Sequence, residues 1–320
     1  MSVDLTYAVA RLKALEAEMP DGQWFLRLAG TDGKSLLEMI RERYPHFREI
    51  EALHLYEDAI EAEKRERLDL IGSIVRDGRT VEFIRSGYDF DDMVQAWKAR
   101  MLGRQPFLAS FGLLSPGEIA GVLESGDPVG LPPYMKRLHG MLLEASKDGD
   151  PAAVQYAGEK ARWDHLRSIA PGAEARRWVA LRIDSANIRI FLSLEWSDIR
   201  KNVPVDIWIE GGTLEASRLE QLRGDPAGDL FSFLAWTDWR SLAGEGFTGE
   251  MDRGAADHLI RKTLLDLIGR GRYRYFDIMP LLYHIELLDR NAELLRTVIT
   301  GRINRLPEKM VAGSVERALN

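Results

Sequence analysis

The chain has 320 residues, with 50 aspartates and glutamates against 43 lysines and arginines and a formal net charge of −7. A mixed, mildly acidic composition of this kind disfavours wholesale binding to nucleic acid. The absence of cysteine excludes disulfides, thiolate catalysis and zinc–thiolate sites, and no apolar run approaches the ~18 residues of a membrane span.

The N-terminal part of the chain predicts helices separated by short breaks. Asp4 and Thr6 are candidate caps for a first helix, which the Pro-Asp-Gly at 20–22 ends. Three further elements are expected: a short aromatic loop over 23–33, a helix over 34–44, and a long amphipathic helix over 48–75 with a charged outer face.

One helical segment recurs three times. It is written DFDDMVQAWKA at 89–99, DSANIRIFLSL at 184–194 and, more divergently, NAELLRTVITG at 291–301. The copies lie roughly 100 residues apart, a period that predicts three related helical units in one chain. A shorter match agrees in phase, because Gly117 and Gly212 each follow the aspartate of their copy by 28 residues.

These patterns predict an all-α fold in which the 320 residues form one domain. The internal repeats are expected at roughly 34–130, 131–228 and 229–320, with residues 1–33 in addition. Residues 205–209 alternate like a strand, but one such run does not make a sheet. The fold class is therefore all-α with short loops.

The second copy carries a resemblance to a known family. Its Asp-x-x-Asn-Ile-Arg helix, from Asp184 to Arg189, is followed by IEGGTL at 209–214. Together they resemble the C-type subunit of the archaeal and bacterial V/A-type ATPases (ATP synthases), equivalent to the d-type subunit of the eukaryotic vacuolar ATPases. The likeness extends from about residue 5 to residue 307. The repeat-motif residues expected to be structural are Asp89, Asp184, Asn187, Arg189, Gly212 and Arg296.

The resemblance implies three similar helical subdomains in a funnel-like arrangement with pseudo-three-fold symmetry. It implies a non-catalytic central rotor subunit that couples the proteolipid ring to the central stalk, at the cytoplasmic face of the membrane and peripheral to it. Its implied partners are the ring and stalk subunits, with no nucleic acid, no direct small-molecule substrate, no cofactor and no metal. ATP hydrolysis or synthesis would belong to other subunits.

The copies also differ at the motif positions. Asp92 stands in the first copy where the second has Asn187, and Val94 stands where the second has Arg189. The third copy has Asn291 in place of the aspartate, although Arg296 matches Arg189. Because most motif positions are expected to face inward, the resemblance does not identify the surface that meets a partner.

A basic segment supplies a candidate partner contact. Arg270, Arg272 and Arg274 alternate with glycine and tyrosine in GRGRYRY, residues 269–275. The segment would suit an acidic protein partner. It would also suit single-stranded nucleic acid, on whose bases aromatic side chains stack. A third interpretation is a plain helix end, where the helix dipole favours positively charged side chains.

Two other functions remain open on the residues alone. Asp89, Asp91 and Asp92 could bind Mg²⁺ and a diphosphate substrate in an all-α metal-dependent enzyme, or could be the acidic start of a helix. A stand-alone helical scaffold would show the same repeats and mixed charge. The six histidines show no spacing typical of metal ligands, and there is no phosphate-binding loop motif.

Overall fold

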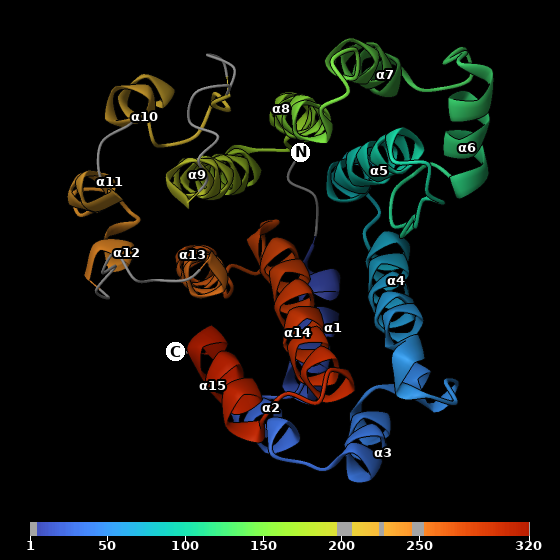
Figure 1. The fold of residues 1–320 in the computed structure, drawn as a ribbon, viewed down its shortest axis with the longest axis vertical. Coiled ribbons are helices and arrows are strands. Elements are labelled where there is room, and N and C mark those ends of the chain that lie inside the picture. The colour runs from blue at the N-terminus through green and yellow to red at the C-terminus, as the bar shows by residue number, and fades with distance from the viewer. Residues whose placement is uncertain (1–4, 197–206, 224–226, 245–252, 320) are drawn as a thin grey trace. The chain divides into compact units, whose positions relative to one another are not determined.

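The computed structural model describes residues 5–196, 207–223, 227–244 and 253–319. Within these ranges the chain forms helices and no strand, which confirms the all-α prediction (Figure 1). No helix in them is long and apolar enough to span a membrane. The chain divides into two compact units, one of residues 75–187 and 203–216, the other of residues 1–74, 188–202 and 217–320. The arrangement in three subdomains remains a prediction.

Most of the helices in the described residues follow one another with short connections, whereas residues 102–115 form a longer one. Those of the N-terminal third are α1 (Thr6–Glu18), α2 (Gly22–Ala29), α3 (Gly33–Arg43), η1 (Pro45–Arg48), η2 (Leu53–Leu55), α4 (Tyr56–Ile74) and α5 (Gly78–Met101). The middle of the chain contains α6 (Pro116–Ser125), α7 (Pro133–Ala145), α8 (Pro151–Ile169), α9 (Ala173–Trp196), α10 (Ala216–Leu222), α11 (Ala227–Leu234) and α12 (Arg240–Gly244). The last three are α13 (Arg253–Gly269), α14 (Met279–Ile303) and α15 (Glu308–Leu319).

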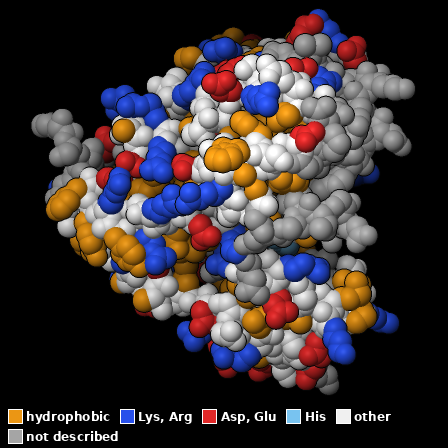
Figure 2. Space-filling view, turned by 90° about the vertical axis from the view of Figure 1, so that its left-hand side faces the viewer, with side chains coloured by type: hydrophobic (Ala, Val, Ile, Leu, Met, Phe, Trp, Pro, Cys, Tyr) orange, Lys and Arg blue, Asp and Glu red, His pale blue; other side chains and the backbone are white. Residues whose placement is uncertain are grey.

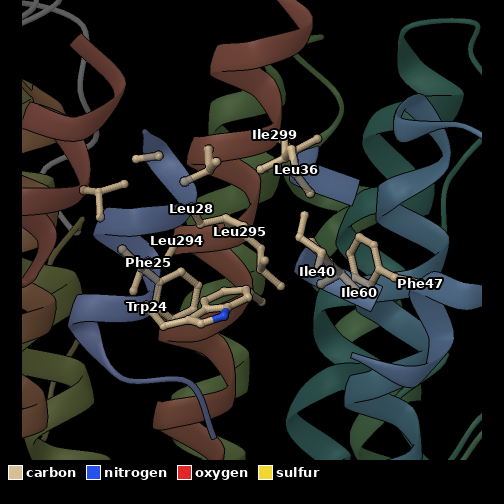
Figure 3. Packing of buried hydrophobic residues seen from close by; sticks show 14 of the residues in the cluster. Trp24, Phe25, Leu28, Leu36, Ile40, Phe47, Ile60, Leu294, Leu295 and Ile299 are labelled. Atoms are coloured by element: carbon tan, nitrogen blue, oxygen red, sulfur yellow. The ribbon is translucent and has the colours of Figure 1, made fainter. Parts of the chain in front are cut away.

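The larger unit is built around α14. This helix buries an apolar stripe that includes Leu294, Leu295 and Ile299, and α2 covers it with Trp24 and Leu28 (Figure 3). Leu295 and Ile299 lie four positions apart and therefore share one face of the helix, and Leu294, about 100° around the helix from Leu295, widens the stripe. Helix α15 packs against both α2 and α14, so the two ends of the chain meet in one core.

The smaller unit has its own core beneath α5. Phe90, Met93 and Trp97 are buried there, and α6, α7 and α8 supply the opposing side chains. Helices α5 and α8 approach closely at one point, because a Cβ atom on Gly158 would lie 2.2 Å from Val94 Cγ2. The absence of a side chain at Gly158 therefore sets the distance between the two helices.

The predicted aromatic loop over 23–33 is wrong, because most of it is helix α2. The Asp21 side chain accepts a hydrogen bond from the Trp24 amide at 2.8 Å, which satisfies a backbone donor at the start of the helix. The expected cap of α1 is corrected as well. Asp4 lies outside the described residues and Thr6 is already helical, while the capping position is Leu5, which has no side-chain cap.

The long helix expected over 48–75 begins only at Tyr56 and ends at Ile74. The residues before it are held in a turn by Arg41, whose guanidinium donates to the carbonyls of Phe47 and Ile50. The strand-like run at 205–209 lies partly outside the described residues. Its described part, 207–209, is not a strand.

Candidate functional site

The repeated aspartate of the first copy is buried in the middle of α5. Asp89 Oδ1 accepts the amides of Leu113 and Leu114 at 2.8 and 2.9 Å, and Oδ2 accepts the Tyr134 hydroxyl at 2.7 Å. Three residues on, Asp92 accepts the amides of Ala109 and Ser110. Both carboxylates therefore fold the loop that follows α5 back onto the helix.

The second copy repeats this arrangement on α9. Asp184 Oδ1 accepts the Leu214 amide at 2.9 Å, and Oδ2 accepts the Thr213 hydroxyl at 2.5 Å. Asn187 donates to the Ile209 carbonyl and accepts from the Ile209 amide, both at 2.9 Å. An amide side chain thus satisfies both backbone groups of Ile209, where Asp92 of the first copy accepts from two amides.

A glycine completes each junction. A Cβ atom on Gly112 would lie 1.9 Å from Asp89 Oδ1, and one on Gly212 would lie 2.2 Å from Asp184 Oδ1. The partner of Gly212 in the first copy is therefore Gly112. The match with Gly117 drawn from equal spacing is wrong, because the loop that returns to the helix is shorter in the first copy.

The geometry distinguishes between the two roles considered for Asp89, Asp91 and Asp92, a diphosphate site and the acidic start of a helix. Asp89 lies far from the N-terminus of α5, so the interpretation as the acidic start of a helix is wrong. Asp89 and Asp92 point to the backbone of the following loop, while Asp91 accepts from Arg162 Nη1 at 2.8 Å. The three carboxylates do not converge on one point by these contacts, which disfavours the diphosphate site.

The matching arginines of the second and third copies both pair with carboxylates. Arg189 Nε donates to Asp257 Oδ1 on α13 at 2.8 Å. Arg296 meets both carboxylate oxygens of Glu57 on α4, at 2.9 to 3.0 Å. Each pair joins two helices of the larger unit.

The three arginines of the basic segment do not behave alike. Arg272 donates to the Tyr283 hydroxyl at 3.2 Å and lies over the Tyr273 ring at 4.7 Å. The hydrogen bond from Arg272 to Tyr283 raises the pKa of Arg272, so its charge is secure. Lys13 of α1 lies over both tyrosine rings, at 5.6 and 5.3 Å. Arg272 therefore anchors the loop on α14, beside α1.

The rest of this segment is exposed. Arg270 and Arg274 face solvent, and Arg274 lies 3.9 Å from Asp277. Tyr273, Tyr275 and Phe276 are 62%, 47% and 78% exposed. We call residues 270–276 the basic loop. Arginine together with exposed aromatic side chains is the composition typical of protein-binding surfaces.

A close glycine keeps the basic loop compact. A Cβ atom on Gly271 would lie 2.3 Å from Met279 Cγ, and the Gly271 amide donates to the Ile268 carbonyl at 2.9 Å. On the face of the molecule shown in Figure 2, side chains of both charge signs are interspersed with hydrophobic ones. The basic loop is thus a fixed feature, held at Gly271 and Arg272, whose outward side chains are exposed to solvent.

Comparison with known families decides the identity of the chain. Residues 8–313 match the family described as ATP synthase (C/AC39) subunit. The chain belongs to this family. Its members are non-catalytic subunits of the ATPase, which is the role that the resemblance implied. None of the curated proteins matches the chain significantly.

Sequence reasoning missed part of what the ATP synthase subunit displays. Phe276 was not among the predicted contact residues, and Tyr283 and Lys13 were not foreseen as the anchor of the basic loop. The aromatic residues next to the arginines were the available signal for the exposed part. The anchor had no local signal, because Lys13 is distant in the sequence.

Proposed function

We propose that the chain is a central rotor subunit of a V/A-type ion-translocating ATPase, and that it couples the membrane proteolipid ring to the central stalk. The observation that carries this proposal is the family match over residues 8–313. The subunit works at the cytoplasmic face of the membrane and is peripheral to it. Other subunits of the complex bind and hydrolyse or synthesise ATP.

A subunit that transmits torque must be stiff. Packed helices are stiff because protein interiors are close-packed and have low compressibility. In each unit the long helices are tied to their neighbours by buried contacts, and at α5 and α9 also by the buried side chains of Asp89 and Asp184. Side chains that hold loops to helices, and perform no chemistry, fit a subunit that transmits force.

The basic loop is the contact that we assign to an acidic surface of the ring or the stalk. Arg270 and Arg274 supply positive charge, and Tyr275 and Phe276 supply apolar area beside them. Such a combination gains affinity when the aromatic side chains are desolvated and the charges are complementary.

The proposal is tested by purifying the tagged chain from gently solubilised membranes and identifying what accompanies it by mass spectrometry. We expect proteolipid, central-stalk and catalytic ATPase subunits in comparable amounts. A double charge reversal, Arg270→Glu with Arg274→Glu, should reduce this recovery roughly tenfold or more, because like charges across an interface cost several kcal/mol.

A matched control is Arg104→Glu, an exposed arginine of the smaller unit. We expect this variant to recover the same subunits as the unmodified chain. All three proteins should unfold at the same temperature, since the changed side chains are exposed. If the unmodified chain brings down none of these subunits, the rotor proposal is wrong. If the double variant recovers them normally, only the assignment of the basic loop is wrong.

A further inference from the structure

Three side chains that are typical metal ligands meet between η1 and α4. His46 lies on η1, and Glu63 and Glu66 lie one turn apart on α4. His46 Nε2 lies 3.1 Å from Glu66 Oε2. One ligand atom from each of the three residues lies within 4.8 Å of the other two. They belong to the same compact unit, and none of them takes part in the proposed partner contact.

The separation of these ligand atoms suits a tetrahedral ion. Zinc binds histidine nitrogen and carboxylate oxygen at about 2.0 to 2.2 Å, so the ligand atoms around it lie about 3.3 Å apart. The distance of 3.1 Å between His46 Nε2 and Glu66 Oε2 is already close to that value. Glu63 then needs only a change of side-chain torsion within its reach to complete three protein ligands.

The scaffold brings the three ligand residues together before any ion arrives. The backbone amide of His46 donates to Glu63 Oε1 at 3.0 Å, which holds this carboxylate beside the ring. Phe47, the next residue, is fully buried, and Arg41 binds its carbonyl. The turn that carries His46 is therefore anchored on both sides.

The other ring nitrogen of His46 also faces a carboxylate. His46 Nδ1 lies 3.8 Å from Glu49 Oε1, on the side away from Glu66. Histidines that bind metals usually donate their second ring N–H to a carboxylate or carbonyl, which fixes the tautomer and raises the basicity of the ligand. Glu49 lies beyond hydrogen-bond distance in this structure and would have to move closer to the ring to take this role.

An unsatisfied buried group lies beside the cluster. The Tyr44 hydroxyl is buried and has no hydrogen-bond partner in the part of the chain that the structure describes. Tyr44 and Glu63 line a common cavity of about 150 Å³, large enough for several waters at about 30 Å³ each.

The charges around the cluster favour a cation. Glu49, Glu63 and Glu66 bring three carboxylates to one histidine, and Arg67 is the cation that acts on Glu63 from α4. Two glutamates on neighbouring turns of one helix repel each other, a cost that a bound divalent ion offsets.

The geometry points to a binding site for a divalent transition-metal ion of the zinc type, held by His46 Nε2, Glu63 and Glu66. Water from the adjoining cavity supplies the remaining coordination position. The mixed nitrogen and oxygen ligand set selects Zn²⁺ over Mg²⁺ and Ca²⁺, which prefer oxygen alone. Since the ligands lie on η1 and α4, the ion would hold these two elements of the larger unit together. This inference is independent of the rotor proposal.

The test is isothermal titration calorimetry, in which ZnCl₂ is added to the tag-free 320-residue chain after treatment with EDTA and removal of the EDTA. We expect one Zn²⁺ per chain and no competition from millimolar Mg²⁺. His46→Gln and Glu66→Gln should each weaken binding roughly tenfold or more, whereas Glu49→Gln should weaken it less, since it removes a support and not a ligand. X-ray absorption of the zinc complex should show one imidazole among oxygen ligands.

His54→Gln is the matched control, because His54 is an exposed histidine of the same region. It should bind Zn²⁺ as the unmodified chain does. Circular dichroism without metal should be unchanged in all variants, since His46 and Glu66 are not in the core. Absence of Zn²⁺ binding in the unmodified chain, or binding unchanged in both His46→Gln and Glu66→Gln, would overturn the inference.

Discussion

His165 shows how one half-buried ring links the stability of the smaller unit to pH. Its imidazole stacks on Tyr134 with ring centroids 4.3 Å apart, and Nε2 lies 3.2 Å from Ser86 Oγ. Burial lowers the pKa of His165 from 6.5 to about 4. In the folded chain the ring therefore stays neutral at pH values where the unfolded chain is protonated.

The sign of the effect follows from this order of pKa values. Between pH 6.5 and about 4 the unfolded state binds more protons, so the free energy of unfolding falls as the pH is lowered through that window. Above pH 6.5 the ring is neutral in both the folded and the unfolded state, and His165 does not change the free energy of unfolding with pH. When the pH is lowered from 6.5 to about 4, we expect the free energy of unfolding to fall by roughly 1 to 2 kcal/mol, after allowing for partial access of solvent to the ring.

The measurement is urea unfolding at several pH values for the unmodified chain and for His165→Gln. The difference between the two should change across pH 4 to 6.5 and be constant above it. His54→Gln, which changes an exposed ring, should follow the unmodified chain at every pH. Parallel curves for His165→Gln would show that the ring does not titrate as described.

At the scale of elements, the junction between a long helix and its returning loop is the recurring device. In α9 it depends on Gly212, where a Cβ atom would lie 2.2 Å from the Asp184 carboxylate. Gly212→Ala should therefore lower the free energy of unfolding by about 1 to 3 kcal/mol or more, because the loop must move away from its hydrogen bonds.

Gly121→Ala is the control for this change. Gly121 lies inside α6 with no atom within 4 Å of an added Cβ, so alanine should stabilise the helix by about 0.5 to 1 kcal/mol. Denaturant unfolding of both variants gives the comparison. Equal stability of Gly212→Ala and the unmodified chain would mean that the close packing at Asp184 is not required.

The sequence could predict the helices that repeat a clear apolar period, and less of what lies between them. Helix α3 was foreseen, whereas α2 was missed, although Asp21 before Trp24 was an available capping signal. Asp89 and Asp184 each accept at least one backbone amide of the loop that follows their helix, but the two loops differ in length, so equal spacing selected Gly117 where the structure has Gly112. Equal spacing fails to align two copies when one loop contains an insertion, whereas the hydrogen bonds of the structure identify the equivalent residues directly.

The candidate contacts were predicted only in outline. The three arginines of the basic loop looked equivalent in sequence, and only the fold separates Arg272, which binds Tyr283, from the exposed Arg270 and Arg274. The cluster of His46 with Glu63 and Glu66 had no signal at all, because the turn before α4 brings together residues that are distant in the chain. Which distant residues become neighbours depends on the fold, and the spacing of residues along the sequence does not reveal it.

At the scale of the whole molecule, the family and the helical construction agree on a mechanical role. The chain belongs to the ATP synthase (C/AC39) subunits, and in the described residues its most buried repeat carboxylates bind loops to helices. A protein built this way contributes stiffness and contact surface. The consequence is that its loss should separate ATP hydrolysis from ion transport and leave the hydrolytic sites themselves intact.

The most direct test is to measure both activities in membrane vesicles from cells that lack this chain. We expect ATP hydrolysis by the remaining catalytic subunits to persist while ATP-driven ion uptake is lost, and we expect the added chain to restore uptake. Vesicles that take up ions at the normal rate without the chain would contradict the rotor account.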